Sequence, residues 1–212
     1  MFTFAREMTE KEISLLDSAV KVFMRFGVKS INMDDMARHL GVSKKTLYLH
    51  FKDKEDMLAR GMRRLCITDD QAVAEICSRG LNAIDESLEI MKFVSAMLRD
   101  LHPSIVFDIE KYHPEVYREM MENRQSCIYG IIYGNLKKGQ KEGLYRKDMK
   151  AEIIAGLYIA KMTSVFDTRL FPNQEFTAAQ LYDEFFIYHI RGIASPAGIA
   201  RLEEKLKTRK KN

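Results

Sequence analysis

The chain has 212 residues, a hydrophobic fraction of 46% and a formal net charge of +4, which is ample for the helical core of one or two domains. No apolar run approaches the roughly 20 residues that cross a bilayer, and the first residues lack the apolar segment of a signal peptide. Three widely spaced cysteines match no zinc or disulfide framework, so we expect a cytoplasmic protein with no membrane partner.

Helical periodicity runs through most of the chain, and only four prolines and eleven glycines interrupt it. We therefore expect an all-α protein. The first predicted helix begins with Thr9-x-x-Glu12, the pattern of a capping box. Its apolar residues recur at helical spacing and form one face, which predicts packing against the following elements. That face comprises Ile13, Leu16, Ala19, Val22, Phe23 and Phe26.

The segment 27–51 has the pattern of two short helices joined by a tight turn. Asn32 can cap the first of them, and the acidic Asp34 and Asp35 follow in its first turn, where the helix dipole favours negative charge. Gly41 suits the left-handed position that ends this helix. The arrangement predicts a helix-turn-helix.

The second short helix, from Ser43 to His50, has an apolar back and a polar front. Leu47 is predicted to point inward, because it continues the apolar core pattern. The side chains left outside are those of Lys44, Lys45, Thr46, Tyr48 and His50. A front of cationic, hydroxyl and aromatic groups suits insertion into a major groove, so we predict binding to double-stranded DNA.

Further helices are predicted beyond residue 52, with Asp53, Asn82, Asp148 and Thr177 as N-caps. Their expected ranges are 53–80, 82–101, 104–112, 114–142, 149–170 and 177–192, with a last helix from Ser195-Pro196 toward the carboxyl end. We expect two domains, a DNA-binding domain over residues 1–52 and a helical domain over residues 53–212.

A longer motif surrounds the predicted helix-turn-helix. It reads A-x-x-x-F-x-x-x-G from Ala19 to Gly27, then M-A-R-H-L-G-V-S-K-K-T-L-Y-x-H-F-K-x-K-E-x-M-L from Met36 to Leu58. This run closely resembles the amino-terminal domain of the tetracycline-repressor (TetR) family. The resemblance implies a homodimeric transcriptional repressor with a three-helix head and a helical ligand-binding and dimerisation body. It also implies release from a palindromic operator by a small hydrophobic or aromatic ligand.

The resemblance also assigns roles to single residues. Lys44, Tyr48 and His50 match positions that commonly contact phosphates or base edges, and Lys54 matches a lysine that contacts a phosphate. Lys45 departs from the family, which often has glycine there. Ile31 stands where a threonine often caps the helix, so we expect Asn32 to take over that cap within the DNA-binding surface.

Two late segments have apolar residues around more than one side, which is typical of a helix with two packing partners. Each could be a plain core helix. The resemblance favours a dimer interface, because members of the family dimerise through a four-helix bundle of their last two main helices. The predicted interface residues are Leu157, Val165, Leu181, Phe185 and Tyr188.

Aromatic and methionine side chains of the predicted body could line an apolar pocket between helices, although each one also fits a plain core position. The candidates are Phe93, Met97, Phe107, Tyr112, Tyr129, Tyr133, Tyr158, Met162 and Phe166. The identity of the small-molecule effector is not predicted.

The segment 102–117 concentrates histidines and carboxylates, which allows a metal or polar ligand site as one interpretation. Two prolines break the segment and nothing fixes a coordination set, so we favour a turn with exposed carboxylates and expect no metal and no cofactor. The chain has no Gly-rich phosphate loop, no H-E-x-x-H and no nucleophile elbow, so we expect no enzyme. The alternative is a helical ligand-binding or protein-interaction module without sequence-specific DNA binding.

Overall fold

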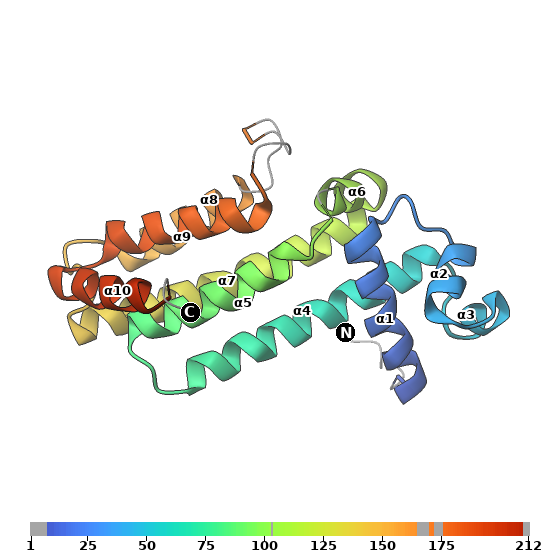
Figure 1. Ribbon diagram of the computed structural model, residues 1–212, viewed down its shortest axis with the longest axis horizontal. Helices are drawn as coiled ribbons and strands as arrows, with labels where there is room; N and C mark the ends of the chain where they lie inside the picture. The colour runs from blue at the N-terminus through green and yellow to red at the C-terminus, as the bar shows by residue number, and fades with distance from the viewer. Residues whose placement is uncertain (1–7, 103, 165–169, 172–175, 210–212) are drawn as a thin grey trace. The chain divides into compact units, whose positions relative to one another are not determined.

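The computed structural model describes residues 8–102, 104–164, 170–171 and 176–209, and it confirms the predicted all-α class (Figure 1). Within these ranges the chain forms ten helices and one isolated antiparallel bridge, between Tyr145 and Ala194. The helices are α1 (Glu10–Phe26), α2 (Met33–Leu40), α3 (Lys44–His50), α4 (Lys54–Ser78), α5 (Ala83–Arg99), α6 (Ile105–Tyr112), α7 (Pro114–Glu142), α8 (Ala151–Ser164), α9 (Ala178–Ile193) and α10 (Pro196–Arg209). None of the described helices is both long and apolar enough to cross a membrane.

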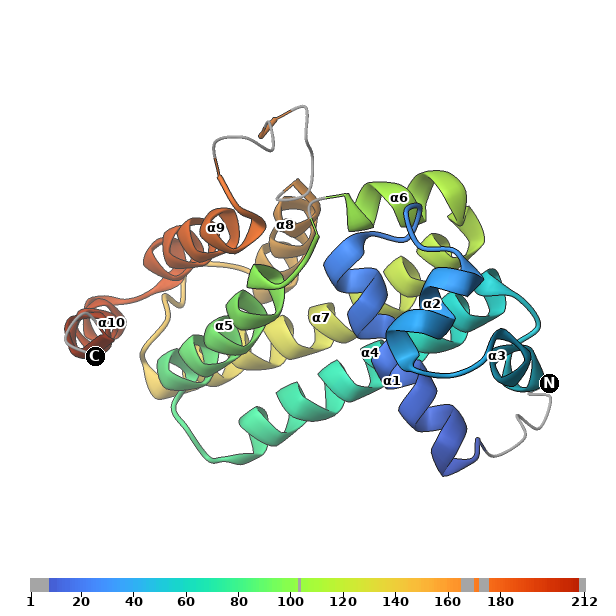
Figure 2. The ribbon, with the colours of Figure 1, turned by 45° about the vertical axis from the view of Figure 1, so that its right-hand side comes forward.

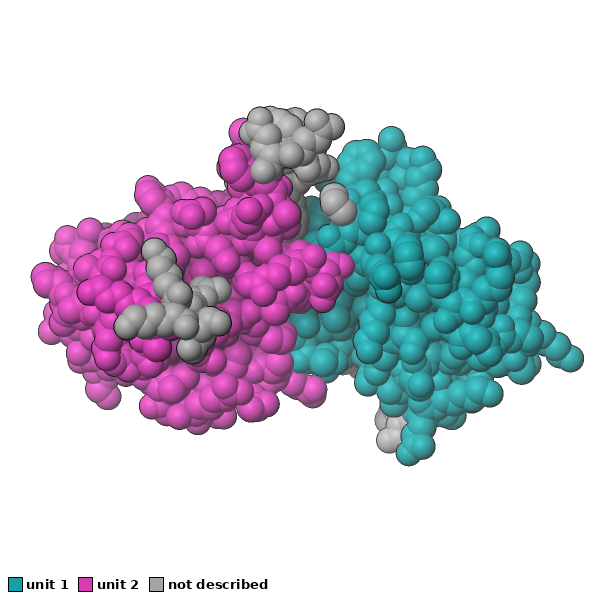
Figure 3. Space-filling model, viewed as in Figure 1, with its two compact units in different colours: residues 1–69, 101–121 teal, residues 70–100, 122–212 magenta. Residues whose placement is uncertain are grey.

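The chain divides into two compact units, which Figure 3 colours separately. The amino-terminal unit comprises Met1–Asp69 and Leu101–Met121, and the carboxy-terminal unit comprises Asp70–Asp100 and Glu122–Asn212. The first part of α4 and all of α6 therefore belong to the same compact unit as α1–α3. The division by function at residue 52 remains a prediction.

The amino-terminal unit has a continuous apolar core, in which α1 contacts α2 and α2 contacts α3 (Figure 2). The predicted capping box of α1 is present, since the Thr9 side chain accepts from the Glu12 amide and the Glu12 carboxylate accepts from the Thr9 amide. The inward face of α1 supplies Leu16 and Phe23, which are almost completely buried. This core fixes how the two short helices are presented.

The turn between α2 and α3 follows the predicted local chemistry. The Asn32 side-chain oxygen accepts from the amides of Asp34 and Asp35 at 2.8 and 2.9 Å, so Asn32 is the cap of α2. Gly41 has a left-handed φ of 65° and ends that helix. Ser43 Oγ accepts from the Thr46 amide at 3.0 Å and starts α3.

The carboxy-terminal unit is built on the contact of α5 with α9, and α10 packs on α5. A cluster of buried polar side chains lies between α5 and α7. In it, the Asn135 amide donates to Glu86 Oε1 at 2.8 Å and to the Ala83 carbonyl at 3.0 Å. The hydroxyl of Tyr145 donates to Asn135 Oδ1 at 2.8 Å. These bonds fix the segment after α7 onto the amino end of α5.

The predicted start of α8 was wrong. Asp148 does not cap a helix from Met149, because the Arg146 guanidinium donates to its carboxylate at 3.1 and 3.4 Å, and α8 begins at Ala151. Arg146 also donates to the Gly192 carbonyl. The predicted end at Leu170 follows residues 165–169, which lie outside the described residues.

Candidate nucleic-acid interface

The rotation of α3 is fixed by Leu47, whose side chain is 0% exposed in the amino-terminal core. Successive residues of an α-helix are turned by about 100°, so the two positions opposite Leu47 are Lys45 and Leu49. Both are exposed, and Leu49 is 73% exposed. Tyr48, 48% exposed, lies beside them. We call Lys45, Tyr48 and Leu49 the crest of α3.

Leu49 was not among the residues predicted to contact DNA. The sequence contained the signal, because Leu49 follows the inward-facing Leu47 by two positions and must therefore lie on the opposite side of the helix. Its exposure places it on the surface that the predicted contact residues share.

Lys44 and Thr46 lie on the flanks of α3, and both have intramolecular partners. Lys44 Nζ donates to the Asp34 carboxylate at 3.0 Å, and this hydrogen bond, with the attraction between the charges, raises the pKa of Lys44. The Thr46 hydroxyl lies 2.8 Å from that of Ser43. Lys44 is therefore a cation linking α3 to α2, placed at the side of the crest.

His50 lies at the carboxyl end of α3 and is partly buried, with Nδ1 3.9 Å from Glu12 Oε1. Arg60 Nη1 donates to the His50 carbonyl at 2.9 Å, and its Nη2 lies 3.5 Å from Glu12 Oε1. The Thr9 amide, by its hydrogen bond, is the main cause that lowers the pKa of Glu12. A buried carboxylate thus fastens the end of α3 to α1 and α4.

The two remaining predicted contact residues begin other helices of the same unit. Asn32 uses its side-chain oxygen to cap α2. Lys54, the first residue of α4, is partly buried; burial lowers its pKa, and the nearby Asp108 carboxylate opposes this shift. The structure therefore collects Lys44, Lys45, Thr46, Tyr48 and His50 on α3 and places Asn32 and Lys54 at the starts of α2 and α4.

Asp108 departs from the prediction of exposed carboxylates in segment 102–117, whereas Glu110 and Glu115 are exposed as predicted. Its carboxylate is buried and accepts from the Lys29 amide at 3.2 Å and from the Ser104 hydroxyl at 3.1 Å. His102 Nδ1 lies 3.0 Å from that same hydroxyl. The prediction was wrong for Asp108 because one of its partners, the Lys29 amide, is distant in sequence. Among the described residues, no group of three or more histidine, cysteine or acidic side chains could hold a metal ion.

The residues predicted for a dimer interface have different exposures. Leu157 on α8 and Tyr188 on α9 are 50% and 68% exposed, whereas Leu181 and Phe185 are partly buried. Val165 lies outside the described residues. The Lys161 ammonium lies over the Tyr188 ring, 5.0 Å from its centroid, so the exposed faces of α8 and α9 adjoin.

His189 lies behind this face, with its ring centroid 4.9 Å from that of Tyr158 and 6.2 Å from that of Phe185. Burial, assisted by the charge of Lys161, lowers the pKa of His189 to about 4. In the unfolded chain the pKa is about 6.5. The unfolded state therefore binds an extra proton between these values, and stability must fall as the pH falls through this window.

We expect the free energy of unfolding to decrease between pH 7 and pH 5, with His189 contributing on the order of 2 kcal/mol of that decrease. His189→Asn removes the titrating group and should flatten the dependence by that amount, as measured by urea denaturation at both pH values. Equal losses in the two proteins would contradict the assignment.

The residues predicted to line a ligand pocket fall in both units. Phe107 and Tyr112 lie in the amino-terminal unit, where both rings are exposed and Lys111 covers them at 5.2 and 5.4 Å. Phe93, Met97, Tyr129, Tyr133, Tyr158 and Met162 lie in the carboxy-terminal unit, and Phe166 lies outside the described residues. Tyr129 and Tyr133 stack on α7 at 6.0 Å. The pocket remains a prediction.

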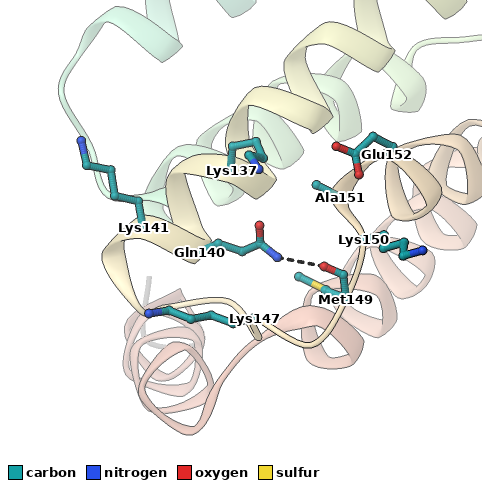
Figure 4. Close-up of a pocket in the computed structure, with 8 residues that line it drawn as sticks. All are labelled: Lys137, Gln140, Lys141, Lys147, Met149, Lys150, Ala151 and Glu152. Carbon is teal, nitrogen blue, oxygen red and sulfur yellow. Dashed lines mark hydrogen bonds between the residues drawn. The ribbon is translucent and has the colours of Figure 1, made fainter.

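A hollow of about 630 Å³ opens instead between the end of α7 and the start of α8. Gln140 donates to the Met149 carbonyl at 3.1 Å across its floor (Figure 4). Its lining is cationic and includes none of the predicted pocket residues: Lys137, Gln140, Lys141, Lys147, Met149, Lys150, Ala151 and Glu152. Lys150 points away from Lys141 and Lys147 (Figure 4), so these donors do not converge on one ligand position.

Residues 15–60 match the family model described as bacterial regulatory proteins, tetR family. The chain is 21% identical over 203 residues to the HTH-type transcriptional repressor BepR of Brucella suis biovar 1, covering 91% of this chain and 96% of that relative.

Two solved structures share the fold. A transcriptional regulator from Saccharomonospora viridis, in complex with choline, has a TM-score of 0.70 and 21% identity, over 89% of this chain and 100% of that one. FadR from Bacillus subtilis, in complex with stearoyl-CoA, has a TM-score of 0.61 and 17% identity, over 85% of this chain and 98% of that one. At these identities the likeness shows the fold.

Proposed function

Because this chain belongs to the tetR family of bacterial regulatory proteins, we propose that this transcriptional regulator acts as a homodimeric repressor of a palindromic operator, released by a small hydrophobic or aromatic ligand. The family and the relatives are regulators, and the chain is not an enzyme. The observation that carries the proposal is α3, whose buried Leu47 turns a cationic and aromatic crest outward.

The crest is proposed to enter the major groove, with the flanks of α3 facing the phosphates. Base-edge contacts specify sequence, whereas phosphate contacts fix position. Lys45 and Tyr48 are therefore assigned to bases. Lys44, Thr46, His50, Lys54 and Asn32 are assigned to the groove rim, where phosphate oxygens accept hydrogen bonds from protein donors.

Dimerisation is proposed through α8 and α9. The exposed Leu157 and Tyr188, with Ile153 one turn before Leu157, give this face large apolar groups that a single copy leaves in water. A two-fold dimer carries two recognition helices, which can read two half-sites one helical turn or a multiple apart. This geometry is the reason to expect a palindrome.

Leu157→Glu places a carboxylate in the proposed interface, where burial without a partner is costly. We expect the variant to be a monomer in sedimentation at micromolar concentration, while the unaltered chain is a dimer. Ile67→Glu is the matched control, because Ile67 is a similarly exposed apolar residue on α4, and it should leave the dimer intact. Dimers of equal stability in all three proteins would contradict the interface.

The effector is proposed to bind in the helical body among the aromatic and methionine candidates. The relatives crystallised with choline and with stearoyl-CoA support an organic small molecule as the effector class. Such a ligand would favour a body conformation in which α4 holds the two heads at a spacing that no longer matches successive major grooves.

The test is selection of duplexes from a random pool by the purified chain, followed by sequencing. A palindrome should be enriched, because two identical heads related by a two-fold axis read the same half-site on both strands. A Lys45→Ala/Tyr48→Ala variant should lose that enrichment. No enrichment by the unaltered chain would favour a ligand-binding or protein-interaction module without sequence-specific DNA binding.

A further inference from the structure

We propose that Leu49 determines specificity by packing against the C5-methyl group of a thymine in the major groove. The inference rests on the proposed DNA-binding function and concerns a residue that the motif does not assign. Its side chain is 73% exposed, which is more than for any other large hydrophobic residue in the described part of the chain.

The position of Leu49 sets it apart from an ordinary exposed leucine. Leu47 is buried, so Leu49 and Lys45 point directly away from the core on the same side of α3. These two residues are one helical turn apart, and Tyr48 lies next to them. The leucine thus lies on the side of α3 that faces away from the core, beside a side chain that can read a base.

The charges around Leu49 favour DNA over an apolar protein partner. Lys44, Lys45 and Lys52 are exposed near it, and docking a hydrophobic protein surface there would remove those ammonium groups from water. A DNA major groove would not leave these ammonium groups without partners. Phosphates along its rims accept the cations, while its floor can present an apolar group to the leucine.

Only one group on the floor of that groove matches a leucine. Guanine and adenine present hydrogen-bonding atoms, cytosine presents an amino group, and thymine adds a methyl group to its O4 acceptor. Leu49 has no donor or acceptor, so contact with the other bases would desolvate polar atoms without replacing their hydrogen bonds. The thymine methyl is therefore the partner that gains from the contact.

Lys45, next to Leu49 on the surface of α3, limits which bases are expected near the thymine in the half-site. Lysine contacts guanine O6 and N7 most often among base edges. One turn of α-helix rises about 5.4 Å, and base pairs are about 3.4 Å apart, so a thymine and a guanine should lie within about two base pairs of each other.

The experiment replaces each thymine of the selected duplex by deoxyuridine, which removes only the methyl group. At one symmetric position the unaltered chain should bind about three- to tenfold more weakly per half-site, which corresponds to burial of one methyl group. The same substitution should change the affinity of Leu49→Ala by less than about twofold, because that variant no longer reaches the methyl group. Leu49→Ala should keep the thermal midpoint of the unaltered chain, since the side chain is solvent-exposed.

Two results would overturn the inference. One is an equal deoxyuridine penalty in the unaltered chain and in Leu49→Ala, and the other is no penalty at any thymine. Both leave the proposed function standing, because sequence-selective binding has then been observed. Failure to enrich any duplex removes the proposed function and the inference with it.

Discussion

Replacing Gly139 by alanine is expected to lower the free energy of unfolding by about 3 kcal/mol, at the upper end of overpacking effects. A Cβ at this position of α7 would lie 2.1 Å from Cδ2 and 2.4 Å from Cε2 of the Tyr145 ring. The ring is almost completely buried, and its hydroxyl is bonded to Asn135, so it has no free space into which to move. The clash must therefore displace α7 from the segment that follows it.

Gly134→Ala is the matched control for this prediction. Gly134 lies on the same helix, and an added Cβ there meets no atom within 4 Å. Alanine should raise stability by about 0.5 to 1 kcal/mol, because glycine loses more backbone freedom on forming a helix. Urea denaturation of the full chain measures both changes. A Gly139→Ala variant as stable as Gly134→Ala would contradict the described packing of Tyr145.

The second large effect is expected at Asp108. Asp108→Ala should lower the free energy of unfolding by about 2 to 3 kcal/mol, because it removes a buried carboxylate and leaves the Lys29 amide and the Ser104 hydroxyl without their acceptor. Gly27 packs closely against the same two side chains, so stability depends more strongly on this contact. Its φ is 81°, and a Cβ there would lie 3.1 Å from Ser104 Oγ and 3.2 Å from Asp108 Oδ2. The loop before α2 is thus fitted closely against α6.

Two variants on α6 separate this contact from general effects of charge. Asp108→Asn keeps one carbonyl oxygen as an acceptor and should lose about 1 kcal/mol. Glu110→Ala removes an exposed carboxylate from the same helix and should change stability by less than about 0.5 kcal/mol. Denaturation curves of the three proteins provide the measurement. An equal loss of stability in Asp108→Ala and Glu110→Ala would show that the Asp108 carboxylate does not hold the loop before α2 against α6.

Local chemistry explains why the helix starts of the amino-terminal unit were predictable. The caps at Thr9, Asn32 and Ser43 each bond to an amide within three residues, so the sequence window that forms the cap also displays it. Gly41 is similar, because its left-handed backbone depends on the turn itself. The all-α class and the orientation of Leu47 followed from periodicity for the same reason.

Features decided by distant neighbours could not be predicted in this way. Asp148 has the sequence of a cap, but Arg146 takes its carboxylate while also bonding to Gly192. The sequence around Asp108 is typical of an exposed acidic residue. Its carboxylate is nevertheless buried and accepts a hydrogen bond from the Lys29 amide, 79 residues earlier. Leu49 differs from both, because counting from Leu47 was enough to find it.

The most direct test of the central claim, that α3 reads a DNA sequence, is the affinity of the chain for the selected palindrome and for a scrambled duplex of equal composition. Both affinities should be measured from about 50 to about 200 mM salt. Both should fall as salt rises, since phosphate contacts release counterions. The palindrome should stay at least about 1,000-fold tighter. Equal affinities for the two duplexes at every salt concentration would contradict sequence reading by this chain.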